Sequence, residues 1–251
     1  MGFRYRSSML VGVPVLLLVA APVALSAQSG QAPIVMFGGE LVGGGTAFEL
    51  TVTNNTPLAV TAWGAHAEFT YDDGKTKGGT WGGEGVYIFE GVVPPDESGQ
   101  RVIPPHTTIR ATFPIADTSG YRGATRISVS LGYAIFEDGT AVGSELFTAR
   151  VFEARAKDAR GWLQVREALT RARTGATGRV ALARAQAETA YEDEGDASSS
   201  PVRGTRINLS IFAKRAQKGL MPDSEIDKRL LELQREAETM AAVAAKHAVR
   251  R

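Results

Sequence analysis

Hydrophobic and polar residues alternate with a period of two over much of the chain between residues 48 and 135. The pattern runs over residues 48–53, 58–71, 109–115 and 127–135. Its apolar positions are Phe48, Leu50, Val52, Trp63, Ala65, Ala67, Phe69, Tyr71, Ile109, Ala111, Phe113, Ile115, Ile127, Val129, Leu131, Tyr133 and Ile135. A period of two predicts strands with one buried face. We expect shorter strands at 34–37, 86–90 and 100–103.

About seven short strands with turn signals between them are typical of an antiparallel β-sandwich. The pattern covers roughly residues 33–143 and resembles immunoglobulin-like, fibronectin-type modules. That resemblance implies architecture and no function, because many unrelated proteins share such a sandwich. The predicted fold class is therefore mainly β plus α: this sandwich, over residues 28–143, followed by a helical C-terminal region.

A turn motif stands twice in the sandwich region, as YDDG at residues 71–74 and FEDG at 136–139. An Asp-Gly pair beside strand residues is a strong hairpin signal, because glycine adopts a positive φ and aspartate tolerates one. Asp73, Gly74, Asp138 and Gly139 are therefore assigned to structural turns. We predict two uses of one turn rather than a duplicated active site, with residues 137–144 leading into the helical region.

The pattern changes to a helical one after residue 144. Residues 145–173 are rich in Ala, Arg, Leu and Glu, lack proline, and predict a long helix. A weaker helix is expected at 179–191, which completes a helical extension over 144–191. The polar stretch 192–205 reads as a flexible linker. Two further helices, at 206–218 and 223–249, would form a C-terminal hairpin within 206–251.

The last predicted helix has an apolar seam at alternating spacings of four and three residues. Its members are Ile226, Leu230, Leu233, Ala237, Met240, Ala244 and His247. The seam is short for a coiled coil, and two alternatives stay open: a homo-oligomer through residues 223–249, or packing on Ile207, Leu209, Ile211 and Phe212 or on the helix before the linker. The turn at Gly219, the acidic helix start and the Leu230–Leu231 pair resemble C-terminal helical hairpins of bacterial proteins, a likeness that implies oligomerisation or localisation.

The first residues have the order of an export signal. Arg4 and Arg6 precede an apolar run from Met9 to Val23, which is followed by the small residues Ala24, Ser26 and Ala27. We predict a signal peptide at 1–27 and a periplasmic or secreted protein with no stable membrane span. The alternative is a membrane anchor formed by an uncleaved N-terminal segment.

Composition and charge narrow the class of protein. The chain has no cysteine, which excludes disulfides and thiol nucleophiles. Residues 28–150 carry 7 Lys and Arg against 13 Asp and Glu, whereas residues 151–251 carry 19 against 14. Neither part is basic enough to predict a nucleic-acid partner. The expected partner is an unknown protein or glycan.

Candidate chemistry is sparse. The three histidines stand apart in the sequence, no nucleophile elbow is present, and the glycine that would complete a P-loop before Lys75 is replaced by Phe69. We predict no enzyme, no cofactor and no metal. Calcium at the acidic turns stays open, since carboxylates are its ligands. So does a carbohydrate-active or other hydrolase that would use Asp72, Asp73, Glu137 and Asp138.

Two aromatic residues, Trp81 and Tyr87, lie in or beside a glycine-rich stretch that we expect to be a flexible loop. Both are candidate ligand contacts, although packing in the core is the stronger expectation for Trp81. The prediction from sequence is an exported noncatalytic binding or scaffold protein, with recognition by the sandwich and docking or oligomerisation by the helical tail. A periplasmic chaperone or inhibitor is a further alternative.

Overall fold

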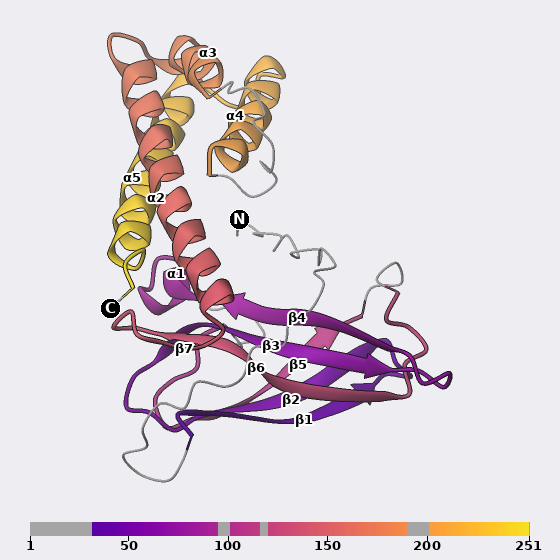
Figure 1. The fold of residues 1–251 in the computed structure, drawn as a ribbon. Helices are drawn as coiled ribbons and strands as arrows, with labels where there is room; N and C mark the ends of the chain where they lie inside the picture. Colours follow the sequence, from indigo (N-terminus) through magenta and orange to yellow (C-terminus); the bar gives the residue numbers. More distant parts are fainter. Residues whose placement is uncertain (1–31, 95–100, 116–119, 190–200, 251) are drawn as a thin grey trace. The chain divides into compact units, whose positions relative to one another are not determined.

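The structure, a computed structural model, describes residues 32–94, 101–115, 120–189 and 201–250 (Figure 1). The predicted signal peptide, 1–27, and most of the predicted linker lie outside the described residues. The described chain divides into two compact units, a β unit that ends at Val151 and a helical unit from Phe152 to Val249. The division falls inside the first long helix, a few residues after the boundary expected at 143.

The β unit contains two antiparallel sheets. One has the order β1 (Ile34–Val42), β2 (Ala47–Asn54) and β5 (Thr108–Pro114). The other has the order β4 (Thr76–Glu84), β3 (Val60–Thr70), β6 (Arg126–Phe136) and β7 (Ala141–Gly143). The period-two segments of the sequence thus form β2, β3, β5 and β6, as predicted.

Both sheets contribute side chains to one hydrophobic core. Phe48 and Leu50 of β2 are buried, as are Trp63 and Phe69 of β3. The rings of Phe48 and Phe69 meet edge to face across the two sheets, with centroids 5.6 Å apart. This burial of alternate residues is the physical basis of the two-residue period, since only one face of each strand turns inward.

Two predictions for the glycine-rich stretch are wrong. Residues 76–84 form β4 rather than a flexible loop, and α1 (Val86–Phe89) stands where a strand was expected. Glycine is normally rare in strands, but here it is needed: a side chain at Gly82 would collide with the carbonyl group of Trp63 on β3. The turn of α1 is favoured by the Glu84 carboxylate, whose Oε1 accepts the backbone N–H of Val86 at 3.0 Å.

In the described part of the chain, four helices follow the sheets: α2 (Glu145–Arg173), α3 (Gly178–Glu188), α4 (Pro201–Gln217) and α5 (Asp223–Lys246). The prediction for α2 is confirmed. The predicted linker extends too far toward the C-terminus, because residues 201–205 already belong to α4. Proline is compatible with a helix start, since the N–H that it lacks has no partner inside the first turn. None of the described helices is both long and apolar enough to cross a bilayer.

The seam of α5 is buried inside the chain. Ile226, Leu230 and Met240 are buried, and Leu233 is half-buried. Val165, Leu169 and Ala172 of α2 and Leu209 and Phe212 of α4 are buried in the same unit. Internal packing, one of the two alternatives for the seam, therefore describes this structure. The expectation that Ile207 and Ile211 of α4 pack against the seam is wrong, because both side chains are exposed.

Candidate functional site

The first acidic turn, which joins β3 to β4, is closed by three hydrogen bonds. The backbone N–H of Gly74 donates to the carbonyl oxygen of Tyr71 at 2.9 Å, and that of Tyr71 donates to the carbonyl oxygen of Lys75 at 3.0 Å. The backbone N–H of Lys75 donates to Oδ1 of Asp73 at 3.1 Å. Gly74 has a φ of 76°, which a side chain would disfavour.

The second acidic turn, between β6 and β7, repeats this pattern. The backbone N–H of Gly139 donates to the carbonyl oxygen of Phe136 at 3.0 Å, and that of Phe136 donates to the carbonyl oxygen of Thr140 at 2.9 Å. The backbone N–H of Thr140 donates to Oδ1 of Asp138 at 2.9 Å. Gly139 has a φ of 87°. The four residues assigned to structural turns therefore hold two copies of one turn.

These two turns lie at opposite ends of their sheet. Strands β3 and β6 are antiparallel: Thr70, before the first turn, pairs with Arg126, and Phe136, before the second turn, pairs with Val60. A rise of ~3.3 Å per residue places the turns on the order of 30 Å apart. A glycosidase needs two carboxylates within about 10 Å of each other. Asp72 and Asp73 therefore do not share a site with Glu137 and Asp138.

One aspartate of each turn is engaged by the residue two positions after it. Oδ2 of Asp73 lies 2.6 Å from Nζ of Lys75, and this hydrogen bond lowers the pKa of the Asp73 carboxyl group. Oδ1 of Asp138 accepts the hydroxyl of Thr140 at 2.7 Å. Among the residues that the structure describes, no three His, Asp or Glu side chains are grouped in a way that would hold a metal ion.

Trp81, a candidate ligand contact, packs on the core from β4. Its ring is edge-on to those of Phe48, Phe69 and Tyr121, with centroid distances of 5.2, 5.4 and 5.2 Å. The side chain is half-buried. Tyr87, the other candidate, lies in α1 and is also partly exposed. The expectation that Trp81 packs in the core is thus confirmed by its ring contacts, and ligand contact by either residue stays a prediction.

An open depression of about 570 Å³ lies beside the first acidic turn. Its lining consists of one tyrosine, two aspartates, two lysines and a threonine of the β3–β4 hairpin, together with two glycines of the segment 120–123: Tyr71, Asp72, Asp73, Lys75, Thr76, Lys77, Gly120 and Gly123. The sequence analysis missed Lys75, Lys77 and the segment 120–123 as parts of one site. The segment 120–123 has no alternating pattern of apolar and polar residues, and its turn residues do not indicate which hairpin it contacts.

Two tyrosines attach the segment at 120–123 to the β3–β4 hairpin. The hydroxyl of Tyr71 donates to the carbonyl oxygen of Gly120 at 2.8 Å, and that of Tyr121 donates to the carbonyl oxygen of Gly78 at 3.0 Å. Partial burial raises the pKa of both phenols, so both hydroxyls keep their protons at neutral pH and remain donors. Nζ of Lys77 lies 4.6 Å from the centre of the Tyr121 ring. The wall of the depression is therefore fixed by side chains of both segments.

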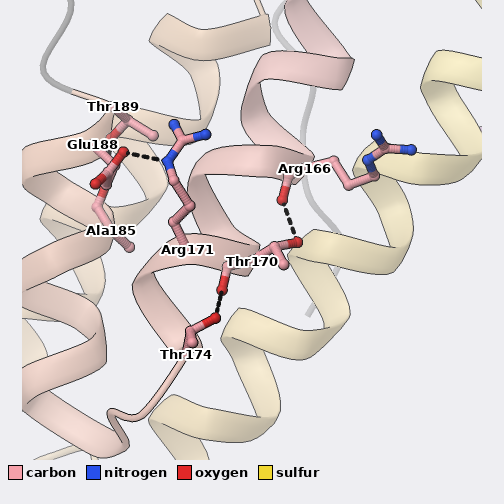
Figure 2. A network of polar contacts seen from close by, with 7 residues as sticks. All are labelled: Arg166, Thr170, Arg171, Thr174, Ala185, Glu188 and Thr189. Carbon is pink, nitrogen blue, oxygen red and sulfur yellow. Dashed lines mark hydrogen bonds and ion pairs between the residues drawn. The ribbon is translucent and has the colours of Figure 1, made fainter.

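The polar contacts in the helical unit connect helices to one another. Nε of Arg171 on α2 lies 2.9 Å from Oε2 of Glu188 on α3, beside the buried Thr189 (Figure 2). The hydroxyl of Thr170 donates to the carbonyl oxygen of Arg166 within α2 at 2.8 Å. A small depression of about 170 Å³ adjoins Arg171 and Glu188. Because these groups are paired with each other, we assign them to helix packing.

Comparisons with known proteins leave the family open. No protein-family model matches the chain, and no curated protein is similar to it in sequence. A solved structure of a hypothetical protein from Peptoclostridium difficile 630 is similar in part, at 10% identity over 47% of this chain and 90% of that chain, with a TM-score of 0.30. A likeness this distant carries no argument about function.

Proposed function

We propose that the protein is an exported, noncatalytic binding protein whose β unit recognises a protein or glycan partner. The β unit would be an immunoglobulin-like, fibronectin-type sandwich. The observation that carries the proposal is the depression at the β3–β4 turn, in which the Tyr71 side chain and charged groups of both signs meet on a hairpin. Binding sites commonly lie on loops that a rigid scaffold positions.

Glycans and polar protein surfaces match the chemistry of this depression. Lys75 and Lys77 are donors, Asp72 is an acceptor, and the Tyr71 ring offers a flat apolar surface. The ring contacts of Tyr121 and the two tyrosine hydrogen bonds hold the wall in place before a ligand arrives. Such preorganisation lowers the entropy that binding would cost. In this proposal the helical unit docks the protein rather than recognising its ligand.

A glycan array followed by titration of the strongest ligand tests the proposal. We expect the double variant Lys75→Ser/Lys77→Ser to weaken binding at least tenfold, because charge-assisted hydrogen bonds contribute on the order of 1.5–3 kcal/mol each. The control is Arg110→Ser, which removes an exposed cation from β5. Binding that survives the Lys75/Lys77 change and is lost with Arg110 would place recognition on the other sheet and overturn the proposal.

A further inference from the structure

The exposed face of α4 is basic and apolar at once. Residues 201–218 contain five Lys and Arg and no Asp or Glu. All of these cations are exposed: Arg203, Arg206, Lys214, Arg215 and Lys218. Ile207 and Ile211 lie among them with 54% and 48% of their surface accessible. A partner that covers this face would therefore offer both apolar groups and negative charge.

Helix geometry places the two isoleucines on the side away from the core of the helical unit. At about 100° per residue, Ile207 and Ile211 are about 40° apart, and Lys214 lies next to them on the same face. Leu209 and Phe212 are buried and point to the opposite side. The core of the unit is thus complete without Ile207 and Ile211, and these side chains are available for contact outside the chain.

The composition of this face discriminates among partners. A second copy of the chain would bring five cations against five, so self-association through α4 is opposed by charge. Nucleic acid would pair with the cations but leave the isoleucines without an apolar contact. Protein hot spots combine arginine with Trp or Tyr anchors, and α4 exposes arginines but no aromatic side chain. An anionic lipid surface satisfies both properties, since its phosphates attract Lys and Arg and its acyl boundary accepts aliphatic side chains.

We propose that α4 lies on the surface of an anionic phospholipid bilayer, with Ile207 and Ile211 entering the boundary between headgroups and acyl chains. The exposed cations along the helix pair with lipid phosphates. The helix stays packed on the helical unit, because its buried face is not used. This contact attaches the protein to the membrane surface without spanning it, and it is independent of ligand recognition by the β unit.

A single fluorescent label reports this contact in the full chain. The protein has no cysteine, so Gly204→Cys introduces one labelling position, at a site where a new side chain would meet open space. A dye such as NBD there lies one turn from Ile207 on the helix surface. Ser224→Cys, at the exposed start of α5, is the control position. The probe surfaces are vesicles of phosphatidylcholine with and without about one-third phosphatidylglycerol.

We expect a blue shift and brighter emission at position 204 with anionic vesicles and none with phosphatidylcholine alone. Replacing two cations, as Arg206→Gln/Arg215→Gln, should weaken partitioning about 30-fold, at about fivefold per cation. Ile207→Ser/Ile211→Ser should weaken it on the order of tenfold or more. The matched controls are Lys228→Gln/Arg235→Gln and Leu146→Ser/Val180→Ser, which change equally exposed residues elsewhere. Circular dichroism of each variant confirms that the helices are retained.

Other results would overturn the proposal. An equal response at positions 204 and 224, or an equal response to both vesicle types, would mean that α4 does not make the contact. Vesicle binding that is unchanged by the cation and isoleucine pairs would place it on another segment. A dye response to a single-stranded DNA oligonucleotide that exceeds the vesicle response and survives Ile207→Ser/Ile211→Ser would assign α4 to nucleic acid instead.

Discussion

Thr140 donates both its backbone N–H and its hydroxyl to the same oxygen of Asp138, at 2.9 and 2.7 Å. In the matching turn the place of Thr140 is taken by Lys75, whose backbone N–H and ammonium group divide the two oxygens of Asp73 between them. The aspartate organises its own turn in both copies. Asp73 and Asp138 thus each have a structural role within their own turn.

Gly139→Val should therefore destabilise the β unit far more than Glu137→Gln. Valine at a φ of 87° is strained by about 2 kcal/mol, whereas Glu137 only accepts a long contact, 3.4 Å, from the backbone N–H of Ala59. Thermal melts of the two variants and the parent chain make the comparison. A large stability loss for Glu137→Gln would contradict this assignment and support an ion site at the second turn.

A collision on β4 gives a second prediction. Gly82→Ala should lower the free energy of unfolding by more than about 2 kcal/mol, because the new methyl group would overlap the carbonyl oxygen of Trp63 and push β4 from β3. Thr80→Ala, on the exposed side of the same strand, is the control and should cost less than about 1 kcal/mol. Urea melts followed by tryptophan fluorescence measure both. Equal effects would mean that β4 is a loop, as the glycine content suggested.

The errors of the sequence analysis have physical causes. Strands β2, β3, β5 and β6 were predictable because one face of each strand is buried. Apolar and polar residues therefore alternate along their sequences. Strand β4 was not predictable. Its glycines are required by the close approach of the β3 backbone, and they leave no pattern of buried and exposed side chains in the sequence. The helices that cover the α5 seam could not be predicted either. A heptad-like pattern is the same whether the covering helix belongs to this chain or to another copy.

The depression beside the β3–β4 turn could likewise be predicted only in part from the sequence. Asp73 and Gly74 were located as a turn because an Asp-Gly pair is a local signal. That Tyr71 meets Gly120 depends on how the chain folds over some fifty residues, and no short-range pattern encodes it. The exposed isoleucines of α4 were missed for the opposite reason, because apolar residues beside a helix core are expected to be buried.

A third prediction concerns the seam of α5. Leu230 is fully buried, so Leu230→Ala should lower the stability of the helical unit by about 2–5 kcal/mol through lost burial and a cavity. Leu163→Ala, at an exposed position of α2, should cost less than about 1 kcal/mol. Light scattering after size exclusion should give the same mass for both variants and for the parent chain. A parent dimer that Leu230→Ala converts into a folded monomer would show that the seam is an interface.

A fourth prediction follows from Glu236 on α5. Desolvation raises the pKa of its carboxyl group, which means that the folded state disfavours the ionised form. A raised folded-state pKa gives a contribution to stability that is complete below the unfolded pKa and is lost as pH rises through the folded value. Glu236→Gln, which is neutral at every pH, should therefore melt at a higher temperature than the parent at pH 7.

That advantage should shrink as the pH falls into the carboxyl range, because the parent then becomes protonated as well. Thermal melts of the helical signal between about pH 3.5 and pH 7 follow it. The control is Glu238→Gln, which removes the same charge from the same helix; both side chains reach the surface. If both variants gain equally at pH 7, the gain reflects the net charge of the helix. If only Glu236→Gln gains, it arises from relief of a desolvated carboxylate at that position.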